Sequence, residues 1–373
     1  MRAEPRRREG AKGSSRLRVF AVSLCLASLL AHTAEAGGPR APRRPAIIAT
    51  VGPRSADPAT LRRMVRGGMR VARVNLSHND RRSAGRLATA VRGAARVERR
   101  AVPLLFDLPG GKVRLGRVNA PVTLVAGQRF DLLPGSRAVA TATSAAVAGH
   151  ELARSARAGD RILLDDGRLE VEVVAASDQR VETRVLRGGA LRSKMGLGLA
   201  DRELHFPAMT SADRRKLAIA VEHGADWIGV SMVQGPHNLR AVRRALDRLG
   251  ASHVKVVAKI ESRSALDNLD AIVAASDIVM IARGDLAVAV GKRGLAAAQR
   301  KIAAAARRRG VPFIVASNLL SGMQSGGRPT RGNRADVARA RAQEARWIML
   351  NETALGQRPV EIVETARGLL AAD

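Results

Sequence analysis

From residue 46 onward, the chain repeats one pattern of hydrophobic and polar positions. A short run of apolar and β-branched residues ends in polar or charged residues, and a longer stretch with helical spacing of its apolar residues follows. Each short run predicts a buried β-strand with a polar carboxyl end. The runs lie at 46–52, 71–78, 102–109, 227–233, 254–262, 278–286, 312–318 and 346–352.

The stretches between these runs predict amphipathic helices. Pro58 and Pro359 stand near the starts of two of them, and Gly310 follows the end of a third, as helix boundaries favour. Strands that alternate with helices pair in parallel through right-handed crossovers, and eight such units close a barrel. We therefore expect an α/β protein built on a (β/α)8 TIM barrel. The predicted helices are 57–68, 79–99, 236–249, 264–276, 294–309, 332–344 and 359–371.

One connection is too long to be a crossover helix. Between the third and fourth predicted strands, the segments A-G-Q-R-F-D-L-L, D-R-I-L-L-D-D-G-R-L-E-V-E-V-V and R-V-E-T-R-V-L-R-G-G alternate apolar and polar residues and predict short antiparallel strands. We expect residues 117–203 to form a small β-barrel cap domain, inserted between strand 3 and helix 3. The barrel then consists of 46–116 and 204–373.

Residues 1–45 form a basic extension that resembles a secretory signal. A basic stretch up to Arg18 precedes an apolar run at 19–30, and Ala34-Glu35-Ala36 resembles a cleavage site. The apolar run is too short for a comfortable membrane span. Two interpretations stay open: a signal within 1–36 that directs export, or an extension that results from a mis-set start codon.

Composition and charge narrow the classes of function. The 373 residues are 46% hydrophobic and 26% charged, which is a globular composition. Tyr is absent and only five Phe and two Trp are present, which argues against base stacking as the main activity. The net charge of +31 favours anionic ligands, or it reflects Arg at solvated positions, and we expect no specific nucleic acid partner. The single cysteine excludes an intramolecular disulfide framework.

The second strand carries polar residues toward its carboxyl end, where TIM barrels place their reactive groups. Arg73, Asn75 and Ser77 alternate, so they share one face of the strand, and His78 follows. Arg beside Asn and Ser suits a phosphate. The alternative is a set of solvated strand-end residues.

The fifth and sixth strands end in a lysine and two carboxylates. Lys259 and Glu261 share one face, and Asp285 stands in Ala282-Arg283-Gly284-Asp285-Leu286. Two carboxylates without Cys or His nearby form a hard oxygen site suited to Mg²⁺. Gly284 lets backbone N–H groups approach an anion, and Lys259 can neutralise charge on a transferred phosphoryl group or an enolate oxygen. Structural salt bridging is the alternative.

Two further strand ends offer candidates. The third strand has Asp107, followed by Arg114, and the seventh has Ser317. No Ser-His-Asp triad, P-loop or zinc-ligand spacing is present in the sequence.

Eight segments, in matching order and spacing, resemble the pyruvate kinase family along almost the whole of residues 46–371. They are A-T-V-G-P (49–53), V-A-R-V-N-L-S-H (71–78), D-D-G (165–167), F-P-A-M-T-S-A-D (206–213), A-K-I-E-S (258–262), I-A-R-G-D-L (281–286), R-P-T-R (328–331) and I-M-L-N-E-T-A (348–354). The resemblance implies glycolytic phosphoryl transfer from phosphoenolpyruvate to ADP, giving pyruvate and ATP.

The resemblance also implies roles for the candidate residues. Glu261 and Asp285 would bind Mg²⁺, for which Mn²⁺ can substitute, and Lys259 would stabilise the transition state. The substrate phosphate would lie on Arg73. The other implied contacts are the substrate carboxylate with Gly284, Asp285 and Ser317, and the nucleotide phosphates with Asn75, Ser77, His78 and Arg114.

The segment D-L-P-G-G-K-V-R-L-G (107–116) resembles a branch of the family that does not need K⁺. Leu108 and Lys112 stand where that branch has Leu and Lys, although Pro109 and Gly111 depart from its pattern. A tethered ammonium can supply the charge of the monovalent cation. We expect the Lys112 ammonium to lie near Asn75, Ser77 and Asp107 and to replace K⁺.

Other segments depart from the family pattern. Met195 stands where the family has a basic residue, Asn333 replaces an acid, and the motif around 351 is one residue short. The chain ends at the predicted last barrel helix, so we expect a short form without the family's C-terminal regulatory domain and without sugar-phosphate activation through it. Weakened activity is compatible with these departures.

Three functions stay open at this point. The first is an active pyruvate kinase. The second is a barrel lyase or aldolase that handles a pyruvate enolate on Mg²⁺, and the third is a catalytically decayed paralogue that binds phosphorylated metabolites or, through its charge, nucleic acid. We expect the first, in the cytoplasm where its substrates are, without a membrane span and with homo-oligomers through barrel faces as an open option.

Overall fold

The computed structural model describes residues 44–165 and 167–372. The basic, signal-like segment therefore lies almost wholly outside the described residues. Within the described part, no helix combines the length and the apolar character needed to cross a membrane.

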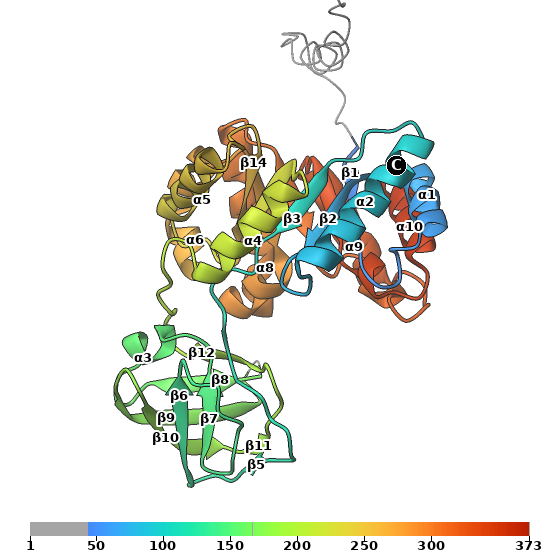
Figure 1. Ribbon diagram of the computed structural model, residues 1–373. Coiled ribbons are helices and arrows are strands. Elements are labelled where there is room, and N and C mark those ends of the chain that lie inside the picture. The colour runs from blue at the N-terminus through green and yellow to red at the C-terminus, as the bar shows by residue number, and fades with distance from the viewer. Residues whose placement is uncertain (1–43, 166, 373) are drawn as a thin grey trace, which may run out of the picture. The chain divides into compact units, whose positions relative to one another are not determined.

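Eight parallel strands close into a barrel, and each of the eight predicted runs overlaps one of them (Figure 1). Each run is apolar because its side chains are buried on both faces, against the barrel interior and against the surrounding helices. The order around the barrel is β1-β17-β16-β15-β14-β13-β3-β2. The bounds are β1 Ala46–Thr50, β2 Met69–Asn75, β3 Leu104–Asp107, β13 Trp227–Val230, β14 Lys255–Ile260, β15 Ile278–Ala282, β16 Phe313–Ala316 and β17 Trp347–Leu350.

Helices cover the outside of the barrel, and the predicted helices are confirmed with two changes of extent. The predicted helix at 264–276 is two short helices, and the helix predicted at 294–309 is the second part of α8, a longer helix that starts at Arg283 and is interrupted at Gly291, where φ is +75°. The helix α4, Ser211–Glu222, was not predicted, although Thr210 and Asp213 form a capping box at its start. The others are α1 Pro58–Gly67, α2 Arg81–Val97, α5 Pro236–Arg248, α6 Arg263–Asp267, α7 Leu269–Ala274, α8 Arg283–Arg308, α9 Arg331–Ala342 and α10 Pro359–Ala371.

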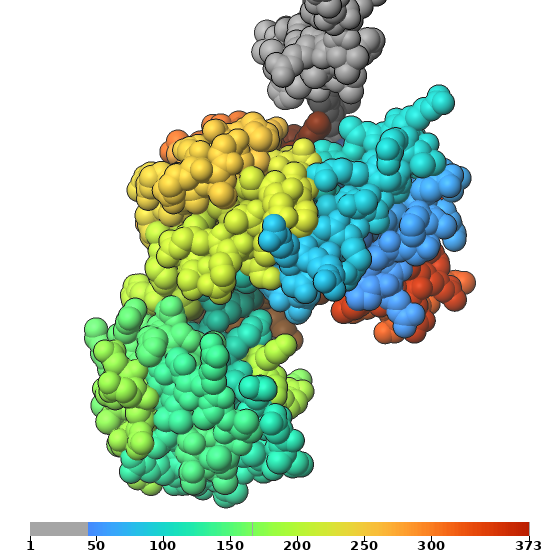
Figure 2. Space-filling model, in the orientation of Figure 1, coloured from blue at the N-terminus to red at the C-terminus, as the bar shows by residue number. Residues whose placement is uncertain are grey.

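Neighbouring helices pack against one another on this outer layer. The helix α1 contacts both α2 and α10, and α4 contacts α5. Figure 2 shows α4 and α5 side by side on the surface of the barrel, in yellow-green and gold. Arg side chains face solvent on these helices, while Leu61, Val91 and Leu246 face the strands. The high Arg content therefore occupies mainly the polar faces of amphipathic helices.

A second sheet lies between β3 and α4, as the long connection predicted. Its strand order is β4-β12-β8-β9-β10-β6-β7, and a bridge between Leu115 and Val147 links its two ends into a barrel-like sheet. It has its own core, which includes Phe130, Ile162 and Val171. The elements are β4 Val113–Arg114, β5 Thr123–Leu124, β6 Arg129–Pro134, β7 Ser144–Val147, α3 Glu151–Ser155, β8 Arg161–Leu164, β9 Leu169–Ala176, β10 Val181–Arg187, β11 Gly189–Ala190 and β12 Gly196–Leu199.

Apolar side chains fill the interior of the large barrel. Trp227 and Trp347 meet edge to face with their ring centroids 5.0 Å apart, near the first residues of β13 and β17. Ile48, Met280 and Met349 belong to the same cluster farther along the strands. This cluster fills the barrel interior with apolar side chains, and the charged side chains gather at the carboxyl ends of the strands.

Candidate active site

A buried arginine joins the carboxyl ends of four barrel strands. Arg73, on β2, donates from Nε and Nη2 to Oδ2 of Asp107 on β3, at 3.0 and 2.6 Å. Its Nη1 donates to Thr50 Oγ1 on β1 at 3.1 Å and to Asn351 Oδ1 after β17 at 3.3 Å. The guanidinium is therefore held in one orientation at the barrel mouth.

Lys259, on β14, lies among three polar partners. Its Nζ is 3.0 Å from Glu261 Oε1 and 3.3 Å from Asp107 Oδ1, and it donates to Ser231 Oγ at 2.5 Å. The lysine side chain is only 9% exposed. A buried ammonium is stable only when opposite charges and acceptors replace its water, and these three groups do so.

Glu261 is buried and held at both carboxylate oxygens. Oε1 pairs with Lys259, and Oε2 accepts a hydrogen bond from the backbone N–H of Met232 at 2.6 Å. Met232 has a φ of +55°, a left-handed conformation that is costly for a side chain of this size. This unusual turn after β13 aims the N–H at Glu261.

Charge coupling determines the ionisation of this cluster. Burial works against the charged form of Asp107, but Lys259 and Arg73 outweigh it and hold the pKa of Asp107 below its ordinary value. Burial likewise disfavours the Lys259 ammonium, and Asp107 and Glu261 outweigh it and raise the pKa of Lys259. Burial raises the pKa of Glu261, Lys259 opposes the rise, and the nearby Asp285 adds to it. Lys259 therefore carries its positive charge at neutral pH.

Gly284 and Asp285 occupy the first turn of α8 rather than the end of a strand. The strand β15 ends at Ala282 and the helix begins at Arg283, so the backbone N–H groups of this turn lack helical partners. Such a turn favours anions. A Cβ built on Gly284 would lie 3.7 Å from Ser317 Oγ, so Ser317 lies against this turn.

The structure corrects the expected position of Lys112. Its Nζ forms an ion pair with Asp285 Oδ1 at 2.7 Å, and not with Asp107, Asn75 or Ser77. Two buried cations, Arg73 and Lys259, already occupy the Asp107 carboxylate. Asp285 is 45% exposed at its side chain, which leaves it accessible to Lys112, on the segment that follows β3.

The candidates for nucleotide contact are less closely grouped. Asn75 ends β2 and accepts a hydrogen bond from the Ser77 N–H at 3.0 Å, whereas Ser77 and His78 are exposed beyond the strand. Arg114 lies on β4 of the second sheet and donates to the Lys194 carbonyl at 3.0 Å. Among the described contacts, none joins Arg114 to Asn75, Ser77 or His78.

Three residues of the cluster were missed in the sequence: Thr50, Ser231 and Asn351. Each is a polar residue at or just after the end of an apolar strand, and each hydrogen-bonds to a charged candidate. The sequence did contain an indication of them, because a polar residue at the carboxyl end of an apolar strand is also the feature that identified Arg73 and Ser317 as candidates. Small neutral side chains at strand ends are too common for that feature to select them alone.

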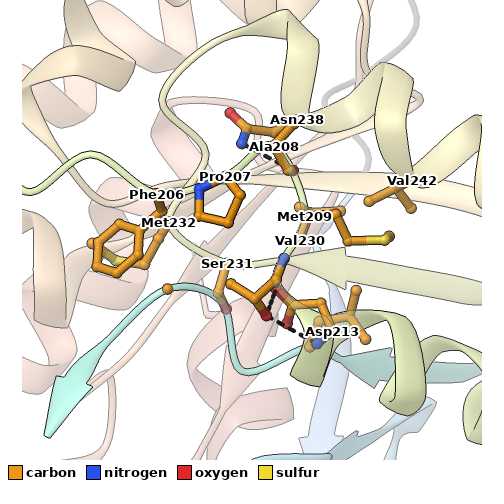
Figure 3. Close-up of a pocket in the computed structure, with 13 residues that line it drawn as sticks. Phe206, Pro207, Ala208, Met209, Asp213, Val230, Ser231, Met232, Asn238 and Val242 are labelled. Atoms are coloured by element: carbon orange, nitrogen blue, oxygen red, sulfur yellow. Dashed lines mark hydrogen bonds between the residues drawn. The ribbon is translucent and has the colours of Figure 1, made fainter. Parts of the chain in front are cut away.

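A pocket lies beside the lysine cluster and shares Ser231 with it. Figure 3 shows Ser231 and Met232 on its wall together with Phe206, Val230 and Val242. A Cβ built on Gly111 would lie 2.2 Å from the Phe206 ring, so only glycine fits there. This contact explains one departure from the family pattern around Lys112.

Glu261 and Asp285 have the chemistry of a Mg²⁺ site. They supply hard carboxylate oxygens, and Asp285 raises the pKa of Glu261, which places two like charges close together. Among the described residues, no group of three or more His, Cys, Asp and Glu could hold a metal. Mg²⁺ is usually bound by one or two carboxylates together with substrate phosphates and water, so two ligands fit it.

We expect Asp107→Asn to lower the free energy of unfolding by about 3–5 kcal/mol, because it leaves Arg73 and Lys259 buried without their shared counter-charge. The folded pKa of Asp107 lies below the unfolded value, so its contribution is present at neutral pH and is lost as pH falls through the folded pKa. Urea unfolding at neutral and acid pH measures both effects. A variant as stable as the wild type at neutral pH would contradict this prediction.

The fold and the site define a (β/α)8-barrel protein with an inserted β domain and a buried lysine–carboxylate cluster at the strand ends. The family model described as "Pyruvate kinase, barrel domain" matches residues 42–363. Pyruvate kinase of Mycobacterium tuberculosis is 36% identical over 332 residues, which cover 88% of this chain and 70% of the relative. The crystal structure of a pyruvate kinase from Cryptosporidium parvum matches with a TM-score of 0.80 at 27% identity, over 88% of this chain and 69% of that one.

This chain belongs to the pyruvate kinase family. Pyruvate kinase of Geobacillus stearothermophilus is 34% identical over 327 residues, which cover 87% of this chain and 56% of the relative. The chain therefore spans little more than half the length of that protein.

Proposed function

We propose that this protein transfers the phosphoryl group of phosphoenolpyruvate to ADP, giving pyruvate and ATP, with a divalent cation. The observation that carries the proposal is the cluster at the barrel mouth, where Arg73 and Lys259 meet the carboxylates of Asp107 and Glu261, with Asp285 close to Glu261. A substrate with both a phosphate and a carboxylate needs cations and N–H donors in this combination.

The reaction breaks the phosphoryl–oxygen bond of phosphoenolpyruvate and forms a bond to a β-phosphate oxygen of ADP. Arg73 binds and orients the phosphoryl group. Lys259 stabilises the negative charge that develops on the enolate oxygen, because it is already positioned and desolvated by Asp107, Glu261 and Ser231. Protonation of the enolate carbon then gives pyruvate.

Glu261 and Asp285 hold the divalent cation, which is Mg²⁺ or Mn²⁺. Bound there, the cation supplies charge neutralisation for the phosphoryl group and the enolate oxygen. The first turn of α8 holds the substrate carboxylate through backbone N–H groups at Gly284 and Asp285, and Ser317 donates a further hydrogen bond. Asn75, Ser77, His78 and Arg114 contact the nucleotide phosphates.

We expect activity without K⁺, because the Lys112 ammonium supplies a tethered positive charge beside Asp285. Activity in a buffer with a bulky organic cation as the only monovalent cation should change little when K⁺ is added. In Lys112→Glu the charge is reversed, and added K⁺ should restore activity. Strong activation of the wild type by K⁺ would contradict this prediction, and Lys292→Glu, on the outer helix α8, controls for the charge change.

A coupled assay tests the proposed function directly. Pyruvate should form from phosphoenolpyruvate only when ADP and Mg²⁺ are both present, and ATP should form in equal amount. Pyruvate formed from other substrates without ADP would identify a lyase, and binding of phosphoenolpyruvate without turnover would identify a decayed paralogue. Both substrates are cytoplasmic metabolites, so we also propose that the protein acts in the cytoplasm, within glycolysis.

A further inference from the structure

Asn351 connects the two ends of the proposed substrate site. It follows β17 and lies between Arg73, the proposed phosphate ligand, and Ser317, the proposed carboxylate ligand. Its Oδ1 accepts from Arg73 Nη1 at 3.3 Å and from Thr50 Oγ1 at 3.5 Å, and its Nδ2 donates to Ser317 Oγ at 3.4 Å. A single side-chain amide therefore spans the site.

Hydrogen-bond chemistry fixes the orientation of this amide. A guanidinium has only donors, so the Asn351 oxygen has to face Arg73. The amide nitrogen then has to face Ser317, which accepts from it. The two ends of an amide are often interchangeable, but here the arginine decides between them.

This orientation determines what Ser317 can do. A hydroxyl has one hydrogen, and because Ser317 Oγ accepts from Asn351, that hydrogen is free to point elsewhere. The hydroxyl lies against Gly284 in the first turn of α8, and Ser317 has a φ of +76°, a left-handed conformation rarely adopted by serine. A carboxylate beside this turn only accepts hydrogen bonds, so it needs Ser317 as a donor.

We infer that Asn351 is a positioning residue that makes Ser317 a hydrogen-bond donor to the substrate carboxylate and holds Arg73 toward the phosphate. The inference rests on the proposed function. The inference also fits the shortened motif I-M-L-N-E-T-A. In this motif, Asn351 lies beside Arg73 and Ser317, and its amide has both an acceptor and a donor for them.

Asn351→Asp is the sharpest test, because it keeps the shape and replaces the donor with a second acceptor. Ser317 would then donate to the introduced carboxylate in place of the substrate, and Arg73 would gain a competing anion. We expect the Kd of phosphoenolpyruvate, measured by calorimetry with Mg²⁺ and without ADP, to rise about tenfold or more. KM for phosphoenolpyruvate should rise in parallel, and KM for ADP should stay within about twofold of the wild type. The matched control is Asn119→Asp, which adds the same charge at an exposed position of the second sheet's segment.

Two further variants separate the contacts and guard against misfolding. In a Ser317→Ala background, the loss caused by Asn351→Asp should be smaller, because only the competition for Arg73 remains. Asn351→Ala, which introduces no charge, should still raise KM for phosphoenolpyruvate by several-fold. Unchanged phosphoenolpyruvate affinity in Asn351→Asp and Asn351→Ala, or an equal loss of ADP affinity, would overturn the inference. A wild-type protein without phosphoenolpyruvate turnover would instead overturn the proposed function.

Discussion

Lys259→Met is expected to lower kcat by about two to three orders of magnitude, since one preorganised charge at a developing oxyanion is typically worth ~3–4 kcal/mol. KM for phosphoenolpyruvate should change much less, because the phosphate and the carboxylate keep their own ligands. The lysine side chain is 9% exposed and is surrounded by Asp107, Glu261 and Ser231. In the variant, water therefore cannot enter to stabilise the enolate oxygen in place of the ammonium. Steady-state kinetics with both substrates varied measures the two effects separately.

The matched control is Lys255→Met, at the exposed first residue of the same strand, which should keep wild-type turnover. Removal of Lys259 also leaves Glu261 buried without its cation, whereas Asp107 keeps Arg73, so the melting temperature has to be recorded alongside the kinetics. A variant that remains folded and shows mainly a raised KM for phosphoenolpyruvate would assign Lys259 to phosphate binding and contradict a transition-state role.

The barrel could be predicted from the sequence because every strand is buried on both faces. A short, continuous apolar run such as 278–282 does not have the pattern of an amphipathic surface helix. Outside the inserted segment, the stretch between two consecutive runs has room for one helix. The ends of the elements were harder to locate. The predicted strand ran on to Leu286, whereas the helix α8 starts at Arg283, because Leu286 is buried and apolar in either conformation.

The charged members of the cluster could also be predicted, because Lys and Glu are rarely buried without a charged partner, so Lys259 and Glu261 at the end of an apolar strand indicate a cluster of paired charges. The partner of Lys112 could not. The Lys112 ammonium does not pair with Asp107 because Arg73 and Lys259 already bind the two oxygens of that carboxylate. These residues are distant in sequence and meet only in the closed barrel. Ser231 and Asn351 were missed for a related reason. A neutral polar side chain can be assigned to the site only when its charged partner is known, and these partners become known only from the structure.

Glu261→Gln and Asp285→Asn should each abolish most of the activity, because each removes one of the two anionic ligands that we propose for the divalent cation. We expect turnover to fall about a hundredfold or more at ordinary Mg²⁺ concentrations. Mn²⁺ affinity, measured by electron paramagnetic resonance without substrates, should fall by about tenfold or more. Glu361→Gln, on the exposed side of α10, is the control and should change neither quantity.

The two variants should differ in stability, and this difference separates a metal site from a structural ion-pair network. Glu261 is buried and neutralises Lys259, so its loss should lower the melting temperature measurably, whereas Asp285 is 45% exposed and pairs with a similarly accessible Lys112. If the cluster serves only structure, Asp285→Asn should leave both Mn²⁺ affinity and turnover near the wild-type values. If it serves as the metal site, Asp285→Asn should lose both while its melting temperature, measured without metal, stays within a few degrees of the wild type.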